Sequence, residues 1–321
     1  QTFNAGLEFI EKHSGTDNWF LQIETFAPHE PFYVPQKYRD MYDQKGDVYF
    51  NWPAYGPIDS SDKSNQNDLV QLRKEYAALI TMCDNYLGKV LDMMDNNSMW
   101  EDTMLIINTD HGFLLGEHDF LGKNFPPMYD EVIHTPFFLH LPGLSTKEYG
   151  HLAQTTDIAP TLLDFFGLDI PDCVTGKSLV KAVRENEPIH ESILFGIHGG
   201  HVNITDSQYT FMKANVNEDN QPYVECTLMP TKMRGYFSLD ELKSAKLVEG
   251  DRHSNGIPYL KYQTKTYMDS KQFGDLLFSN DDIFQQDNIT DCLLREKYSK
   301  MLKNKMEIYD APIEEFIRIG F

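Results

Sequence analysis

The amino-acid sequence predicts an α/β protein in which a mostly parallel central sheet, flanked by helices, is followed by a smaller α+β domain. The first observation is the apolar, β-branched run at residues 103–108, which is long enough for one buried strand. The second is the apolar stripe of a long helix at residues 69–96, which separates this run from an earlier strand at residues 19–26. Strands that lie parallel on either side of such a helix predict a right-handed crossover. The third is a change to short alternating runs from Tyr209 onward, which is typical of an antiparallel sheet.

Composition narrows the classes of function. The chain has 321 residues, with 28 Lys and Arg against 49 Asp and Glu and a net charge of −21. This acidity argues against nucleic acid as a partner, because phosphate binding needs a basic surface. No run of about 18 apolar residues is present, so the sequence predicts no membrane span. The cysteines lie far apart without metal-type spacing, which indicates reduced thiols and favours the cytoplasm while leaving the localisation open.

The first part of the chain leads to a histidine on a rigid backbone. A short amphipathic helix at residues 3–13 precedes the strand at residues 19–26, which runs into the segment Pro-His-Glu-Pro-Phe. His29 lies between two prolines, and such rigidity suits a group that binds a ligand. Residues 34–68 then predict a long irregular loop that faces substrate, and Asn67 or Asp68 is expected to cap the long helix.

The central strand ends at a group of polar residues. Asp110, His111 and Gly112 follow directly after it, at the carboxyl end where open α/β sheets bind ligands. Asp110 offers oxygen ligands and His111 a nitrogen ligand for a divalent metal, and this pair suits zinc or manganese as well as calcium. Lys123 follows a second glycine in the next loop, and an apolar strand at residues 136–141 closes the unit.

The second half of the chain contains fewer candidate residues. A helix capped by Asp157 precedes a strand at residues 193–197, which leads into His198-Gly199-Gly200-His201. We expect a substrate-facing role for this segment, and for His201 in particular. The alternating runs and a last amphipathic helix at residues 293–308 place the predicted domains at residues 1–204 and 205–321.

Several of these segments resemble the type I sulfatases, the formylglycine-dependent branch of the alkaline phosphatase superfamily. The resemblance extends over nearly the whole chain and rests on the strings PHEPF, TDHGFLLGEH, GK, HTPFFLHLPG and DIAPTLLDFFGL. It implies an alkaline-phosphatase-like fold and the hydrolysis of sulfate esters. It also implies that Asp110 and His111 bind calcium, with Mg²⁺, Mn²⁺ and Zn²⁺ left open. Lys123 and His29 would be catalytic, on the sulfate and its bridging oxygen, and His118 would contact substrate.

The sequence also departs from this family. His134 stands where many relatives carry an arginine, which leaves its role open. The nucleophile of the family is made from Cys or Ser within C/S-x-P/A-x-R, and neither that motif nor the paired aspartates that complete the metal site are present. None of the four cysteines has that context: Cys83, Cys173, Cys226 and Cys292. The chain therefore resembles the C-terminal two-thirds of a sulfatase, and we expect a separate N-terminal segment to supply the formylglycine.

The expected partners are a sulfated small molecule or sulfated sugar, together with that N-terminal segment. Two alternatives remain open. One is a phosphonate or phosphodiester hydrolase of the same superfamily, and the other is a catalytically silent binding domain.

Overall fold

The structure, a computed structural model, describes residues 1–43, 50–232 and 235–321. The described chain forms two compact units. The first comprises Gln1–Asn124 and Glu131–Thr146, and the second comprises Phe125–Asp130 and Lys147–Phe321. Residues 147–204 thus belong with the second unit, while the domain boundary near residue 205 stays a prediction.

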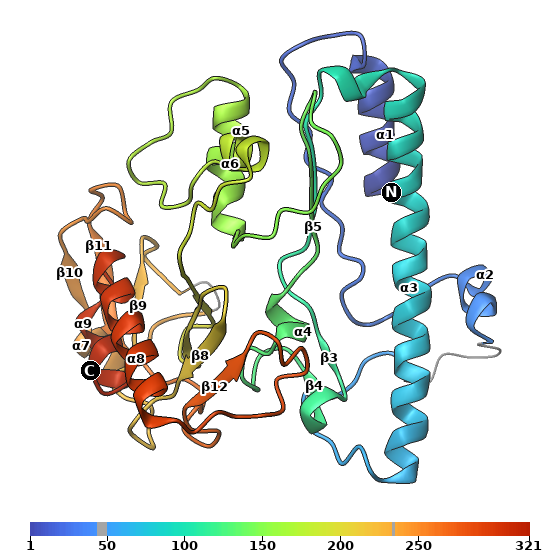
Figure 1. Cartoon of the computed structure of the whole chain (residues 1–321). Coiled ribbons are helices and arrows are strands. Elements are labelled where there is room, and N and C mark those ends of the chain that lie inside the picture. Colours follow the sequence, from blue (N-terminus) through green and yellow to red (C-terminus); the bar gives the residue numbers. More distant parts are fainter. Residues whose placement is uncertain (44–49, 233–234) are drawn as a thin grey trace. The chain divides into compact units, whose positions relative to one another are not determined.

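The first unit is built along one long helix, α3 (Lys63–Asn96). The Asp62 carboxylate caps it by accepting hydrogen bonds from the backbone N–H groups of Ser64 and Asn65. The helix therefore begins before the predicted cap at Asn67 or Asp68. The prediction placed the start too late because residues 63–68 are all polar and show no apolar helical period. The predicted helix at residues 3–13 is confirmed as α1 (Thr2–His13), which packs alongside the C-terminal half of α3 (Figure 1).

The remaining elements of the first unit are short. The part of the predicted loop at residues 44–49 lies outside the described residues. The helices and 3-10 helices are α2 (Gln36–Arg39), η1 (Asp40–Tyr42), η2 (Met99–Glu101), η3 (Glu117–Asp119) and α4 (Asp130–Ile133). The strands are β1 (Gly56–Pro57), β2 (Leu105–Asn108), β3 (Leu114–Leu115), β4 (Phe120–Gly122) and β5 (Phe137–His140).

Strand pairing corrects one prediction. The α/β class with a C-terminal sheet is confirmed, but β2 pairs with β5 in antiparallel register, with Leu105 opposite His140. Residues 19–26 form no strand, and every strand pairing within the described ranges is antiparallel. The predicted parallel arrangement of the central strand is therefore wrong for these residues. The connection between β2 and β5 contains no helix longer than the single turn α4, whereas parallel neighbours need a crossover connection, usually through a helix.

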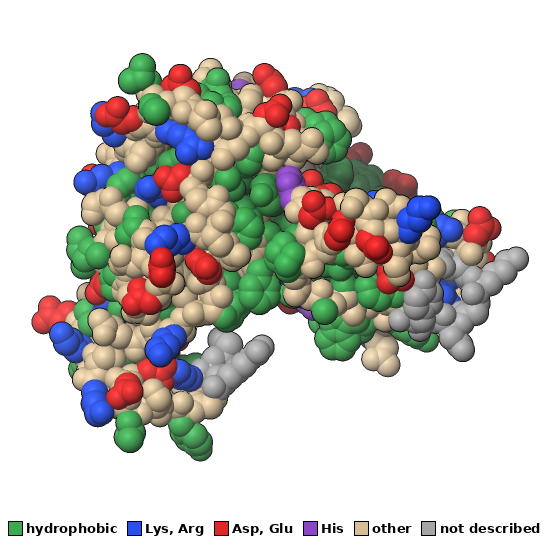
Figure 2. Space-filling model, turned by 90° about the horizontal axis from the view of Figure 1, so that it is seen from below, with side chains coloured by type: hydrophobic (Ala, Val, Ile, Leu, Met, Phe, Trp, Pro, Cys, Tyr) green, Lys and Arg blue, Asp and Glu red, His purple; other side chains and the backbone are tan. Residues whose placement is uncertain are grey.

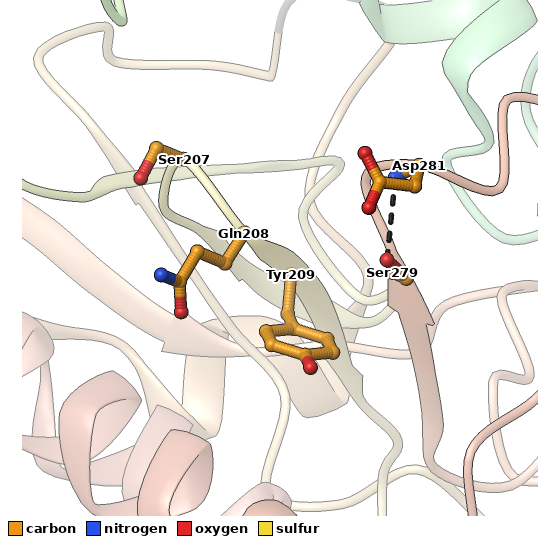
Figure 3. A pocket seen from close by; sticks show the side chains of 5 residues that line it. All are labelled: Ser207, Gln208, Tyr209, Ser279 and Asp281. Carbon is orange, nitrogen blue, oxygen red and sulfur yellow. Dashed lines mark hydrogen bonds between the residues drawn. The ribbon is translucent and has the colours of Figure 1, made fainter.

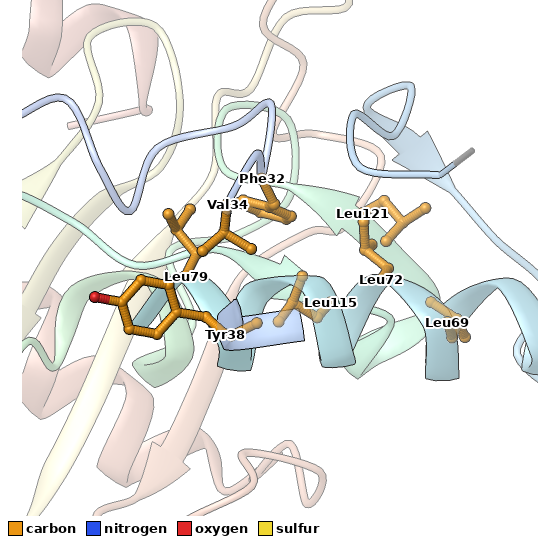
Figure 4. Packing of buried hydrophobic residues seen from close by; sticks show 9 residues of the cluster. Phe32, Val34, Tyr38, Leu69, Leu72, Leu79, Leu115 and Leu121 are labelled. Carbon is orange, nitrogen blue, oxygen red and sulfur yellow. The ribbon is translucent and has the colours of Figure 1, made fainter. Parts of the chain in front are cut away.

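A buried apolar cluster joins the loops of the first unit to α3. Figure 4 shows the side chains of Phe32 and Val34 meeting Leu72 and Leu79 of the helix, with Leu121 of β4 at the same cluster. Leu72 is fully buried. The helix therefore fixes both the segment that follows His29 and the strand that leads to Lys123.

The second unit contains two antiparallel sheets. Strands β6 (Ile193–Gly196), β7 (Val202–Thr205), β8 (Tyr209–Lys213) and β12 (Leu276–Ser279) form one sheet in the order β12-β8-β7-β6. The other sheet, in the order β10-β11-β9, contains β9 (Val224–Thr227), β10 (Lys246–Val248) and β11 (Tyr259–Gln263). The helices are α5 (Ile158–Phe165), α6 (Leu179–Glu185), α7 (Leu239–Ser244), α8 (Cys292–Ile308) and α9 (Ile313–Arg318), with the 3-10 helix η4 (Thr155–Asp157) before α5.

Helix α8 covers the four-stranded sheet, and the C-terminal tail is docked against this unit. Arg318 is almost fully buried and donates hydrogen bonds to the Glu315 carboxylate and to Asn220 Oδ1. Its guanidinium is therefore occupied within the unit.

On the face seen in Figure 2, carboxylates and cationic side chains are both spread over the surface. None of the helices in the described part of the chain is both long and apolar enough to cross a bilayer.

We predict that Leu72→Ala lowers the free energy of unfolding by about 2–5 kcal/mol, because it leaves a cavity in the cluster that joins the loops to α3. Val70→Ala is the matched control, since Val70 lies on the same helix with 53% of its surface exposed. Its effect should stay within about 0.5 kcal/mol. Urea unfolding followed by circular dichroism measures both values, and equal losses would contradict the central role of this cluster.

Candidate functional site

His29 and Lys123 lie in direct contact. The Nδ1 atom of His29 lies 2.5 Å from the backbone oxygen of Glu30, and because a carbonyl only accepts, Nδ1 carries the proton. The Nε2 atom is then the acceptor, and Lys123 Nζ donates to it over 2.8 Å. The imidazole also packs against the Phe26 ring, with ring centroids 4.4 Å apart. The structure thus brings the two predicted catalytic side chains together.

A carboxylate that sequence reasoning missed completes this contact. Glu30 is 4% exposed, and its two carboxylate oxygens lie 3.3 and 3.5 Å from Lys123 Nζ. Lys123 itself is only 8% exposed. The hydroxyl of Tyr55 donates to the same carboxylate. In the sequence, the glutamate lies within the rigid Pro-His-Glu-Pro segment and the tyrosine within the loop at residues 34–68, but neither pattern shows that the two side chains meet.

Local backbone structure explains how these groups meet. Strand β1 pairs with β4, which places Gly56 opposite Leu121 and brings Tyr55 next to Gly122. Gly122 has a φ of +119°, and a Cβ atom there would lie 2.9 Å from the Tyr55 ring. Only glycine therefore allows both the turn into Lys123 and the close approach of the tyrosine.

Asp110 and His111 form a second group in the same unit. The Oδ1 atom of Asp110 accepts from the backbone N–H of His111 at 2.9 Å. His111 Nδ1 donates to the Gly112 carbonyl at 2.9 Å, which leaves Nε2 with its lone pair 3.5 Å from Asp110 Oδ2. Both side chains are accessible to solvent, with 83% of Asp110 and 38% of His111 exposed.

This donor set fits a divalent metal. A carboxylate oxygen and a neutral imidazole nitrogen 3.5 Å apart can contact one ion, because metal–ligand distances are about 2.0–2.6 Å. Within the described ranges, no group of three or more His, Cys, Asp or Glu side chains is placed to hold a metal ion. The two residues therefore provide part of a coordination shell.

The polypeptide around Gly112 links the two groups. The Gly112 N–H donates to the Val132 carbonyl at 2.7 Å, and a Cβ atom at position 112 would lie 1.9 Å from the Glu131 oxygen. The next residue, Phe113, packs edge-on against both Phe32 and Tyr55. The turn after β2 is thereby packed against the segments that carry Glu30 and its tyrosine.

The other predicted residues have different surroundings. His118 lies in the first unit, where its Nε2 atom is 3.3 Å from the Glu131 carboxylate and 13% of its side chain is exposed. His134 is an exposed residue just after α4. His201 belongs to the second unit, is 5% exposed and donates from Nε2 to the Gly274 carbonyl at 3.0 Å. The substrate-binding roles of His118 and His201 stay predictions.

A cavity of about 310 Å³ lies in the second unit (Figure 3). It is lined by Ser207, Gln208, Tyr209, Ser279 and Asp281. No positively charged side chain lines it, so it does not suit an anionic sulfate group.

Comparison with known proteins places these observations in a family. The family model of the sulfatases matches residues 1–168. An arylsulfatase of Clostridium perfringens is 25% identical over 281 residues, which cover 80% of this chain and 55% of that protein. An ulvan-active sulfatase of Formosa agariphila is 29% identical over 278 residues, with coverages of 79% and 53%. The chain spans about half the length of these curated relatives.

Solved structures show the same fold. A protein in complex with its substrate D-glucosamine-2-N,6-O-disulfate matches 96% of this chain and 68% of its own, with a TM-score of 0.61 and 13% identity. The phosphonate monoester hydrolase of Agrobacterium radiobacter matches 94% of this chain and 59% of its own, with a TM-score of 0.58 and 19% identity.

We predict that His201 makes the second unit sensitive to acid. Burial lowers the pKa of His201 from about 6.5 to about 4. Between these values the unfolded chain binds a proton that the folded unit does not, so the free energy of unfolding falls as the pH drops through this window. The loss reaches about 3 kcal/mol near pH 4.

The variant His201→Gln keeps an Nε2 donor for the Gly274 carbonyl and does not titrate. Urea unfolding at several pH values between 7 and 4 should therefore show a smaller loss of stability for the variant than for the wild type. Parallel curves for the two proteins would contradict the prediction.

Proposed function

This chain belongs to the sulfatase family, and from that premise we propose that it forms the metal-binding and sulfate-binding part of a sulfuric ester hydrolase. The observation that carries the proposal is the contact of Lys123 Nζ with His29 Nε2 at 2.8 Å. This contact places an ammonium group and an imidazole side by side. The ammonium group suits the negative charge of a sulfate ester, and the imidazole suits its bridging oxygen, which must be protonated when the leaving group departs.

Lys123 would bind a non-bridging sulfate oxygen. Its side chain is only 9% exposed, and a charge in such a water-poor position stabilises a developing negative charge more strongly than one in solvent. In the form with Nδ1 protonated, His29 would first take up a proton on Nε2 when an ester displaces the hydrogen bond from Lys123. It would then transfer that proton from Nε2 to the bridging oxygen as the leaving group departs, which returns the ring to the Nδ1–H form. Its side chain is 40% exposed, so a substrate can reach the ring.

Asp110 and His111 would hold a divalent metal. Such an ion, when bound, supplies positive charge to the ester oxygens and to the nucleophile. We propose calcium on the basis of the family resemblance, while the carboxylate–imidazole pair also accepts Mg²⁺, Mn²⁺ or Zn²⁺. Neutral His111 Nε2, left unprotonated by the Nδ1 contact with Gly112, is in the form that binds a metal.

The formylglycine nucleophile and the other metal ligands would come from a polypeptide segment beyond these residues. The proposal is supported by the relatives, which are about twice as long as the matched region. It is also supported by the cysteines of this chain, none of which lies in C-x-P-x-R.

We propose a sulfated sugar as the substrate class. The support comes from the relative described as active on ulvan and from the structural neighbour bound to a disulfated glucosamine. A second candidate is the hydrolysis of phosphonate monoesters or phosphodiesters. It is favoured by the fact that Lys123 and His29 would contact any singly charged ester in the same way.

The test uses the complete natural protein that contains this chain. Peptide mapping by mass spectrometry should find a Cys or Ser converted to formylglycine, and the protein should hydrolyse 4-nitrophenyl sulfate. Faster hydrolysis of a 4-nitrophenyl phosphodiester than of the sulfate would favour the second candidate. The absence of both activities, with no formylglycine, would overturn the proposal in favour of a binding domain.

We predict that Lys123→Ala lowers kcat for sulfate ester hydrolysis by about 100–1000-fold, because it removes a preorganised positive charge from the transition state. The control is Lys12→Ala in the same unit, since 64% of the Lys12 side chain is exposed. Steady-state kinetics on both purified variants, with thermal unfolding to verify folding, gives the comparison. Similar kcat values for the two variants would contradict the role of Lys123.

We predict that Asp110→Asn weakens metal binding by about tenfold or more, because a neutral amide replaces a charged oxygen ligand. Asp84→Asn is the control, on an exposed position of α3. Metal content after dialysis against a buffered series of Ca²⁺ concentrations measures the affinity independently of activity. An unchanged affinity of the Asp110 variant would remove this residue from the metal site.

A further inference from the structure

We propose that Glu30 sets the charge specificity of the site by restricting it to ester groups that carry a single negative charge. The inference rests on the proposed function, since it concerns the anion that Lys123 and His29 bind. It identifies Glu30 as a specificity-determining residue that acts through Lys123, rather than as a group that touches the reacting atoms.

Glu30 is buried, so its carboxylate does not face the solvent-accessible side of the site. It is 4% exposed, whereas 40% of the neighbouring His29 side chain is exposed. Lys123 is in contact with both, with Nζ 2.8 Å from the imidazole and 3.3 Å from the nearer carboxylate oxygen. The ammonium group therefore contacts a buried carboxylate and also an imidazole that solvent, or a substrate, can reach.

The carboxylate is held firmly in this position. The Tyr55 hydroxyl donates to Glu30, while the Tyr55 ring packs edge-on against Phe113 and closely against Gly122. Because these contacts hold the carboxylate, we expect it to stay beside Lys123 when an anion binds.

The charges of Lys123, Glu30 and His29 sum to zero. Lys123 contributes one positive charge and Glu30 one negative charge, and His29 is neutral in the form that accepts a hydrogen bond from Lys123. A singly charged ester can approach the ammonium group, which is nearer to it than the buried carboxylate. Of the described side chains in contact here, Lys123 is the one cation, so a second negative charge on the ester would gain no further attraction and would be repelled by Glu30.

This rule depends on charge and not on the central atom. Sulfate monoesters, phosphodiesters and phosphonate monoesters all carry one negative charge at neutral pH. Phosphate monoesters carry nearly two above their second pKa of about 6. The site should therefore accept the first three classes and discriminate against the last.

The experiment compares three substrates with one leaving group in the complete natural protein: 4-nitrophenyl sulfate, the monoester 4-nitrophenyl phenylphosphonate and 4-nitrophenyl phosphate, at pH 8. In Glu30→Gln, which keeps an oxygen acceptor for Tyr55, the kcat/KM for the dianionic phosphate should rise relative to both monoanions by about tenfold or more. The ratio of the two monoanions to each other should stay within about twofold.

Two matched variants separate charge from structure. Glu30→Asp keeps the negative charge and should keep the discrimination against the dianion. Glu24→Gln makes the same chemical change at an exposed position of the same segment, so it should leave all three ratios unchanged.

A second measurement needs no variant, in case Glu30→Gln does not fold because it leaves Lys123 without its buried partner. In the wild type, the kcat/KM ratio of 4-nitrophenyl phosphate to 4-nitrophenyl sulfate should rise as the pH falls from 8 to 5, because the phosphate ester becomes a monoanion below about pH 6 while the sulfate ester keeps its charge.

The outcomes distinguish this inference from the proposed function. A wild-type protein that hydrolyses the sulfate ester, together with unchanged ratios in Glu30→Gln or a pH-independent ratio in the wild type, would overturn the role of Glu30 alone. A wild-type protein that hydrolyses neither monoanionic ester would overturn the proposed function.

Discussion

The buried ion pair between Lys123 and Glu30 is the interaction on which the candidate site depends. Burying two charges costs several kcal/mol for each ion, and their attraction offsets that cost only when the remaining hydrogen-bonding groups also find partners. Here Glu30 also accepts from Tyr55, and Lys123 also donates to His29. Because loss of either charge would leave the other buried and unpaired, the three segments that carry these side chains are held as one structural group.

Packing on α3 gives this group its fixed geometry. Phe32 follows Glu30 by two residues and Leu121 precedes Lys123 by two, and both belong to the cluster around Leu72 (Figure 4). The helix carries no predicted catalytic residue. It nevertheless determines the site, because both chain segments reach the ion pair only when their apolar residues are packed on the same stripe of the helix.

The sequence predicts the residues that lie in local motifs, but it does not predict contacts between residues that are far apart in the chain. His29, Asp110 and Lys123 lie in short local motifs, so the sequence identifies them. The role of Glu30 depends on a partner 93 residues away, and no local pattern encodes that contact. The apolar residues 103–108 correctly predict a strand, β2, but the strand is only partly buried in the structure. Their pattern also contains no information about the direction of the neighbouring strand, so the antiparallel pairing of β2 with β5 was missed.

The charge of a metal ion bound by Asp110 and His111 also affects which esters the site attracts. Its carboxylate and imidazole lone pair face each other at 3.5 Å, an arrangement that a bound cation would make favourable. One divalent ion, Asp110, Lys123 and Glu30 would together carry a single positive charge, which matches a singly charged ester. Calcium takes six to eight oxygen ligands, so the shell needs more donors than this pair. Each further carboxylate ligand would lower this sum and would therefore weaken the attraction of the site for a second negative charge on the ester.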